Sequence, residues 1–413
     1  METAIKQIPD SLENLYGSVN HDFNNLNKIS IQKTITGLEK EMILIFNWFS
    51  IWKIVFRHFK NPMKALKILT IIDQNTKKFL GDGGIKKYKK VDGKYYLDLY
   101  IPGLNSIAYE KFMEGEINRI SSIECKTNRF TNIFIAITKK CPLRCEHCFE
   151  WDVLNENEAL SLSNIQEIVN KIQGKGSGII QFTGGEPMLR VDDLIEILNQ
   201  SEKDTEFWVL TSGYKFTFEN AKKLKAAGLT GVVVSLDHFN PEMHNLIRGS
   251  KYSYQWVEAA VKNAIANNLV TTLSICVSNS FVTQNNLVKY IELAKEMGVS
   301  FVQILEPKAV GHYAGKDIAL TKESRDLLDG FYYSINFDKK YMHYPIVTYH
   351  GHYQRQIGCF AAGNRNLYID TDGDIHACPF CREKMGSALA DNLDELLLRL
   401  QIKGCQTYKN SSF

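Results

Sequence analysis

The chain has 413 residues, of which 44% are hydrophobic and 23% are charged, as expected for a soluble globular protein of two or three domains. Its formal net charge of +3 gives no indication of a nucleic-acid partner. The nine cysteines are an odd number and mostly gather in two clusters, which indicates metal-bound thiols in a reducing compartment and excludes a disulfide framework. Residues 1–27 lack the apolar core of a secretory signal, so we expect a cytoplasmic protein.

Residues 1–80 are predicted to form an N-terminal, mainly helical region. Asn61 and Pro62 divide two helices, because asparagine caps a helix and proline is favoured at its first position. The apolar run Met42–Trp52 is about half of the roughly 20 residues that span a bilayer. Basic residues follow it at helical spacing, namely Lys53, Arg57, Lys60, Lys64 and Lys67.

Two interpretations of residues 42–67 remain open. Between Lys40 and Lys94 there are 13 Lys/Arg and 4 Asp/Glu residues, a local balance of +9. A basic amphipathic helix can rest on an anionic membrane or bind a partner, which predicts a peripheral membrane contact. The simpler interpretation is a helix that packs on the rest of the protein and keeps its basic face in water.

Residues 81–130 are predicted to form a β-hairpin connector. Two strand-like runs, Tyr88–Val91 and Lys94–Tyr100, flank Asp92-Gly93, which is a strong hairpin signal. A short helix is expected around Ser106–Phe112.

Residues 131–307 are predicted to form an α/β core. Strand-like and helical runs alternate six times, which indicates parallel strands joined by right-handed crossovers. The period fits an open sheet and a barrel equally. The expected strands are Ile133–Thr138, Ile179–Phe182, Phe207–Leu210, Val232–Leu236, Thr271–Val277 and Phe301–Leu305. The expected helices are Leu162–Ile172, Asp192–Asn199, Phe218–Ala227, Tyr254–Asn267 and Leu287–Met297.

Three cysteines, Cys141, Cys145 and Cys148, directly follow the first of these strands. Thiols spaced four and three apart fit a loop that wraps one side of a small metal cluster. A closed zinc site takes four ligands, and a closed iron–sulfur cluster usually takes four cysteines. Three thiolates leave one metal position open, so this loop predicts chemistry as well as folding.

Polar and glycine residues follow the other predicted strands as well. In α/β sheets and barrels, sites lie at the carboxyl ends of the strands. The second strand ends in two glycines, which let a ligand approach the backbone. The strand-end segments are Thr183–Pro187, Thr211–Gly213, Ser235–Asp237, Ser278-Asn279 and Glu306-Pro307. Five such ends in phase with the thiol triad that follows the first strand predict a single site.

Residues 308–413 are predicted to form a linker and a small cysteine-rich domain. The strand–helix alternation stops after Pro307, and a tight hairpin is expected from Tyr368 to Ile375. The remaining clustered cysteines are Cys359, Cys378, Cys381 and Cys405.

Residues 133–305 resemble a radical SAM enzyme. The motifs that carry the resemblance are Cys141, Cys145, Cys148 and Phe149, then Gly184–Pro187. Ser235–Asp237 followed by His244–Gly249 is similar to the peptide-modifying members. The resemblance implies a partial (β/α)6 barrel with a 4Fe-4S cluster on the three cysteines. The open iron takes S-adenosylmethionine, and one-electron reduction yields a 5′-deoxyadenosyl radical that abstracts a substrate hydrogen.

The same resemblance implies roles for individual residues. The Gly184–Glu186 loop would hold the methionine amino end, and Arg248 would pair with its carboxylate. Ser235 would lie near the ribose, and Phe149 would pack beside the adenine. The implied cofactor-binding set is Phe149, Gly184, Gly185, Glu186, Pro187, Ser212, Ser235, Asp237 and Arg248. The candidates for substrate contact or proton transfer are Glu306, His312 and Tyr313.

The second cysteine group resembles the C-terminal auxiliary-cluster region called SPASM or, in its shorter form, Twitch. The full SPASM region carries seven cysteines, whereas four occur here, which implies one auxiliary 4Fe-4S cluster. If Cys405 is a ligand, that cluster is closed and serves electron transfer or structure; if it is not, an open iron can bind substrate. A zinc site on the same four thiols is the alternative.

These residues are compatible with three functions. The first is a radical SAM oxidoreductase, a peptide maturase, that receives electrons from a donor such as flavodoxin or ferredoxin. The second keeps the radical chemistry but acts on a small molecule or a lipid head group at a membrane surface. The third is a non-enzymatic binding protein with structural metal sites, which the three-thiol loop and the intact glycine motif argue against.

Overall fold

The computed structural model describes residues 32–80, 84–123, 130–359 and 361–405. Its centre is a nine-stranded sheet with the strand order β10-β9-β8-β7-β6-β5-β4-β11-β12. The six strands predicted from the sequence are confirmed and pair in parallel. They are β4 (Asn132–Ala136), β5 (Ile179–Thr183), β6 (Glu206–Thr211), β7 (Leu229–Ser235), β8 (Val270–Cys276) and β9 (Phe301–Leu305).

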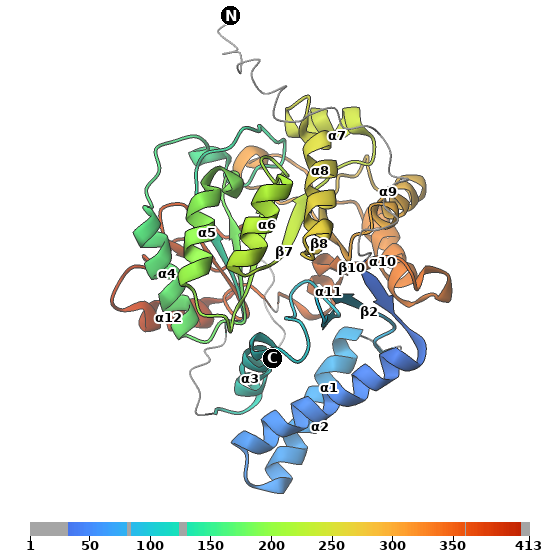
Figure 1. Ribbon diagram of the computed structural model, residues 1–413, viewed down its shortest axis with the longest axis vertical. Helices are drawn as coiled ribbons and strands as arrows, with labels where there is room; N and C mark the ends of the chain where they lie inside the picture. The colour runs from blue at the N-terminus through green and yellow to red at the C-terminus, as the bar shows by residue number, and fades with distance from the viewer. Residues whose placement is uncertain (1–31, 81–83, 124–129, 360, 406–413) are drawn as a thin grey trace, which may run out of the picture. The chain divides into compact units, whose positions relative to one another are not determined.

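Helices connect these strands and lie side by side around the sheet (Figure 1). Most begin at a side chain that accepts a hydrogen bond from the first turn, as Ser161 and Thr217 do. They are α4 (Leu162–Gly174), α5 (Val191–Gln200), α6 (Phe218–Ala227), α8 (Ser253–Ala266) and α9 (Gln284–Glu296). The sequence did not predict the additional helix α7 (Pro241–Arg248), which precedes α8.

The expectation that the strand–helix alternation stops after Pro307 is wrong. Helix α10 (Lys322–Phe337) leads into β10 (Ile346–Tyr349), which pairs in parallel with β9. The predicted hairpin is confirmed as β11 (Asn366–Ile369) and β12 (Ile375–His376). In addition, β11 pairs in parallel with β4. The segments that complete the C-terminal part are α11 (His350–Ile357) and α12 (Leu393–Lys403).

The N-terminal part contains the two predicted helices, α1 (Gly37–His58) and α2 (Pro62–Leu80). The Asn61 side chain accepts hydrogen bonds from the amides of Met63 and Lys64 at 3.0 and 3.3 Å, as expected of an N-cap. Helices α1 and α2 share one hydrophobic cluster with α3 (Ile107–Ile120) and lie beside it (Figure 1). Among the helices in the described ranges, none combines the length and apolarity needed to cross a bilayer.

The predicted hairpin is β2 (Tyr88–Val91) and β3 (Lys94–Tyr96), and β1 (Lys33–Ile35) adds a third strand beside β2. The turn residues Asp92 and Gly93 have φ values of 49° and 76°, as a type I′ turn requires. Tyr96 and Leu99 pack among inward-facing side chains from the first positions of several strands. Those side chains are Ile179, Val270, Phe301 and Ile346, together with Trp208 and Val233.

In this cluster, one residue from each of the strands β5 through β10 packs with Val91, Tyr96 and Leu99 of the hairpin and the segment after it. The cluster fills the amino ends of the strands with apolar side chains. The carboxyl ends are therefore the edge where polar groups can gather. The sheet is open, since β10 and β12 are its two edge strands.

Candidate functional site

The three cysteines of the first motif lie on a loop that begins where β4 ends. Two backbone hydrogen bonds tie this loop to the end of α7: the Arg144 amide donates to the Arg248 carbonyl, and the Glu146 amide donates to the Ile247 carbonyl. A third bond runs from the His312 amide to the Cys148 carbonyl at 2.9 Å. The loop is thus held from two distant segments of the chain.

The backbone of the glycine motif after β5 packs directly against the cysteine loop. The Gly185 amide donates to the Thr138 carbonyl at 2.7 Å. A β-carbon placed on Gly184 would lie 2.5 Å from that carbonyl oxygen, and one on Gly185 would lie 2.2 Å from the Lys140 oxygen. Both distances are too short for any side chain, so the two loops can approach this closely only with glycine at both positions.

Burial disfavours the deprotonated, charged form of the three thiols. It raises the pKa of Cys148 to about 12, with a further contribution from Cys145, and it raises the pKa values of Cys141 and Cys145. Mutual repulsion of the thiolates acts in the same direction. A cationic metal centre would offset both effects, because thiolate ligands bind metal in the deprotonated form. The donor set therefore fits an iron–sulfur cluster.

Glu186 is buried and joins the end of β5 to the end of β6. Its carboxylate accepts hydrogen bonds from Thr211 Oγ1 at 2.6 Å, from the Ser212 amide at 2.8 Å and from the Ser212 hydroxyl. The Met188 amide donates to it as well, at 3.0 Å. Because the protein occupies these lone pairs, Glu186 and Ser212 fix the shape of the glycine loop. Pro187 follows as the first residue of a 3₁₀ turn, Pro187–Arg190.

Asp237 and Arg248 form a buried ion pair behind the cysteine loop. The Arg248 Nε lies 2.5 Å from Asp237 Oδ2, and Arg248 Nη1 donates to the Cys145 thiol sulfur at 3.6 Å. His147 Nε2 lies 3.5 Å from the same Asp237 oxygen. Burial alone would raise the pKa of Asp237, but Arg248, followed by His147 and His244, lowers it below its usual value. A positive charge therefore lies beside one of the three thiols.

Ser235 is the last residue of β7, opposite Ser274 of β8, and is half-buried. Phe149 directly follows Cys148 on the cysteine loop. Its ring meets Tyr368 of β11 and Phe380 edge-on, with centroids 6.0 and 6.1 Å apart.

Phe380 lies between Cys378 and Cys381, so Phe149 directly connects the two cysteine groups. A second link involves Glu150, which accepts a hydrogen bond from Tyr368 Oη at 2.6 Å and lies 3.4 Å from Arg382 Nη1. The C-terminal cysteine region is therefore packed onto the first cysteine loop.

The four C-terminal thiols contact one another. Cys378 Sγ lies 3.3 Å from Cys381 Sγ, and Cys405 hydrogen-bonds with both Cys359 and Cys381. Cys359 also accepts from the Ala362 amide at 3.4 Å. In the described ranges, no three His, Cys, Asp or Glu side chains have the geometry of a site for one metal ion. The contacts place Cys405 with the other three cysteines.

The candidates for substrate contact lie after β9. Glu306 accepts a hydrogen bond from Tyr349 Oη at 2.7 Å and pairs with Arg355 of α11. His312 instead supports the cysteine loop: its Nδ1 lies 3.0 Å from the Cys145 carbonyl, and its ring stacks on Trp151 at 3.8 Å. Burial raises the pKa of Tyr313 to about 12.

Sequence reasoning missed Tyr349 and Arg355, which surround Glu306, and Asp329 of α10, which also pairs with Arg355. Recognising β10 would have placed Tyr349 at the same strand end as Glu306. No comparable signal identifies Arg355 or Asp329, because both lie on helices far from the motifs.

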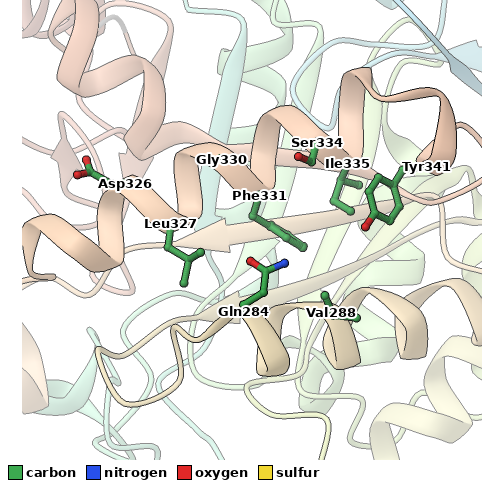
Figure 2. Close-up of a pocket in the computed structure, with 9 residues that line it drawn as sticks. All are labelled: Gln284, Val288, Asp326, Leu327, Gly330, Phe331, Ser334, Ile335 and Tyr341. Carbon is green, nitrogen blue, oxygen red and sulfur yellow. The ribbon is translucent and has the colours of Figure 1, made fainter.

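A pocket of about 290 Å³ lies elsewhere, between α9 and α10. Figure 2 shows Phe331 and Leu327 of α10 facing Gln284 and Val288 of α9 across it. None of the predicted site residues lines this pocket. It lies between covering helices and not at the strand ends, so we do not assign it to the cysteine site.

Comparison with known proteins supports the resemblance inferred from the motifs. Residues 135–294 match the family model described as Radical SAM superfamily. A GTP 3′,8-cyclase of Photorhabdus laumondii is 26% identical over 302 residues, which cover 66% of this chain and 88% of the relative. The mycofactocin maturase MftC of Mycolicibacterium smegmatis is 27% identical over 251 residues, 59% of this chain and 63% of the relative.

Among solved structures, SuiB of Streptococcus suis bound to its precursor peptide SuiA has a similar fold. Its TM-score is 0.55 at 14% sequence identity, over 77% of this chain and 76% of SuiB. The family implies a 4Fe-4S cluster and S-adenosylmethionine as cofactors. The three-cysteine loop, the glycine motif that packs on it and the parallel sheet all agree with the match of residues 135–294 to the Radical SAM superfamily model.

Proposed function

We propose that this radical SAM enzyme modifies a peptide or protein substrate in the cytoplasm. Cys141, Cys145 and Cys148 would hold a 4Fe-4S cluster, with the glycine motif holding S-adenosylmethionine beside it. When bound, these cofactors supply the electron and the 5′-deoxyadenosyl radical for hydrogen abstraction. A protein donor such as flavodoxin or ferredoxin would deliver the electron.

In this proposal the residues of the chain position the cofactors and keep out water. Gly184 and Gly185 leave backbone atoms accessible to the methionine amino group, while Glu186 and Ser212 keep the loop rigid. Ser235 and Phe149 flank the nucleoside, and Pro187 starts the turn beside it. Arg248 already uses Nε and Nη1 on Asp237 and Cys145, which leaves Nη2 for the methionine carboxylate. Glu306, His312 and Tyr313 remain candidates for substrate contact.

The observation that carries the proposal is the contact between the two cysteine groups through Phe149 and Phe380. We infer that Cys359, Cys378, Cys381 and Cys405 hold a closed auxiliary 4Fe-4S cluster in a SPASM-like or Twitch-like domain. A second redox centre beside the first suits oxidative modification of a side chain. The fold shared with SuiB, which was solved with its precursor peptide, and the identity with a maturase support a peptide as substrate.

A small molecule is the second candidate. The observation in its favour is the identity with a GTP 3′,8-cyclase over 88% of that relative. A nucleotide or a lipid head group would then take the place of the peptide, while the cysteine loop and glycine motif keep the same roles.

The two candidates differ in what stimulates 5′-deoxyadenosine release. Protein reconstituted anaerobically with iron and sulfide would be reduced and given S-adenosylmethionine with either GTP or a short peptide encoded beside the gene. We expect release to rise with the peptide, whose mass should change, and not with GTP. A Cys145→Ala variant is the control and should show neither. Consumption of GTP with an unchanged peptide would reject the peptide proposal in favour of the second candidate.

A further inference from the structure

Helix α1 is apolar on two opposite faces. Ile43, Ile51, Ile54 and Val55 are at most 7% exposed and pack in the N-terminal hydrophobic cluster. The opposite face carries large apolar side chains that remain in water. They are Leu38, Met42, Ile45, Phe46, Phe49 and Trp52, with exposed fractions from 47% to 85%.

These exposed side chains form one continuous stripe. Leu38, Met42, Ile45, Phe49 and Trp52 follow each other at intervals of four, three, four and three residues, which places them on one side of an α-helix. Burying a side chain of this size is worth about 1.5–3 kcal/mol. Scattered apolar residues are normal on a protein surface, whereas a contiguous patch marks an interaction site.

Beyond its first turn, the stripe has only basic residues beside it. Glu39 and Glu41, at the start of α1, pair with Lys33 and Lys40 at 2.9 and 2.7 Å. No Asp or Glu occurs from Met42 to Ile72. Lys53, Lys60, Lys64 and Lys67 are all exposed at the end of α1 and the start of α2. Arg57, the fifth basic residue, instead pairs with Glu110 and Glu114 of α3 at 3.1 Å.

This charge distribution selects the kind of partner. A second copy of the chain, related by two-fold symmetry, would bring the same lysine-rich segment toward itself and would be opposed by repulsion. An anionic lipid surface satisfies both features, because it buries an apolar helix face and attracts each nearby lysine by about 1 kcal/mol. Tryptophan and phenylalanine also suit the boundary between headgroups and acyl chains.

We propose that α1 and the start of α2 dock the enzyme peripherally on an anionic lipid surface. Helix α1 lies in the plane of the interface, with Phe46, Phe49 and Trp52 among the lipids. Lys53, Lys60 and Lys64 contact the headgroups. This docking is independent of which substrate the cysteine site modifies.

The test is flotation of the full-length protein with vesicles. Vesicles of phosphatidylcholine mixed with phosphatidylglycerol should bind the protein, and vesicles of phosphatidylcholine alone should bind it at least tenfold more weakly. Added salt should weaken the first interaction, because the attraction is screened. A Phe46→Ser, Phe49→Ser variant should lose at least tenfold in binding. The matched control is Phe218→Ser, Leu398→Ser, whose side chains are 52% and 57% exposed elsewhere.

Charge reversal provides a second variant. Lys53→Glu, Lys60→Glu, Lys64→Glu should abolish the preference for anionic vesicles, while Lys222→Glu, Lys262→Glu, at exposed positions, should retain it. Unchanged melting temperatures would show that all variants fold. No vesicle binding by the wild type, or equal losses in the control variants, would overturn the proposal. A dimer seen by light scattering that dissociates in the Phe46→Ser, Phe49→Ser variant, without vesicle binding, would instead assign the stripe to a second copy.

Discussion

The contacts of single atoms determine how the cysteine loop is held. Gly185 is the clearest case, because a β-carbon there would lie 2.2 Å from the Lys140 oxygen, directly before Cys141. Lys140 cannot retreat easily, since its carbonyl also accepts from the Glu186 amide at 2.8 Å. One methyl group at this point would therefore displace the segment that carries the first thiol.

We predict that Gly185→Ala lowers both iron content and 5′-deoxyadenosine release by at least tenfold. The added methyl group separates the glycine motif from the cysteine loop. Iron and sulfide analysis after anaerobic reconstitution, followed by chromatography of the nucleoside, measures both effects. Gly174→Ala is the matched control, because its β-carbon would meet nothing within 4 Å. Full iron loading of Gly185→Ala would contradict this account of the two loops.

Asp98 gives a prediction about pH. Its carboxylate accepts from the Tyr100 amide at 2.9 Å and from Thr348 Oγ1 at 3.2 Å, and burial raises its pKa from 3.8 to about 6. Between these two values the unfolded chain has lost the proton that the folded protein still holds. The contribution of Asp98 to stability is therefore present below about pH 4 and is lost as the pH rises to about 6.

Asp98→Asn should remove this dependence and raise the free energy of unfolding above pH 6 by about 3 kcal/mol. Denaturant titrations at pH 5 and pH 7, for the variant and the wild type, measure the difference. The wild-type curve should approach that of the variant at the lower pH. A constant difference at both pH values would rule out titration of Asp98 as the cause.

At the scale of whole elements, the main feature is the docking of β11 and the second cysteine group onto the first. Tyr368 of β11 donates to Glu150, a carboxylate that is 3% exposed. Tyr368→Phe removes the donor and leaves Arg382 as the remaining side-chain partner of this carboxylate among the described residues, which should cost about 1–3 kcal/mol of unfolding free energy. Thermal denaturation measures the loss. Tyr333→Phe, on a ring that is 47% exposed, should leave the free energy of unfolding unchanged. An equal loss in that variant would show that the hydrogen bond to Glu150 is not the cause.

The sequence predicted the elements of the core better than those at its two edges. The six core strands were recognisable because they are apolar runs separated by amphipathic helices. Strands β10 and β11 are not recognisable as members of the sheet, since each has only four residues. Their place depends on pairing with β9 and β4, which local patterns do not reveal. Helix α3 was expected to end at Phe112 and continues to Ile120.

The candidate site was predictable to a different degree for each kind of residue. Cysteines and glycines could be proposed from spacing, because few structures require them in such patterns. The partners of Arg248 and Glu306 could not, since Cys145 lies 103 residues from Arg248, and Glu306 lies 49 residues from Arg355. The roles proposed for Arg248, Ser235 and Phe149 toward S-adenosylmethionine remain predictions, as do the three boundaries between the four predicted domains.

For the whole molecule, the two cysteine groups should be separable by mutation. We predict that Cys378→Ala, Cys381→Ala keeps the first cluster and the cleavage of S-adenosylmethionine yet loses turnover of substrate by at least tenfold. Iron content should fall by the share of one cluster, as measured after reconstitution. Cys125→Ala, which belongs to neither group in the sequence, should have no effect. Normal product formation by the double variant would show that turnover does not need an auxiliary cluster.

The pairing of β11 with β4 has a consequence for biosynthesis. Asn366 is aligned with Asn132. The strand that leads into the cysteine loop therefore pairs with a strand that is synthesised much later. Until the ribosome has released residue 369, one edge of β4 exposes unpaired backbone beside Ile133 and Ile135, both fully buried in the finished sheet. Such an apolar edge invites aggregation. Nascent chains are thus most vulnerable after the core is made and before its last parallel strand arrives.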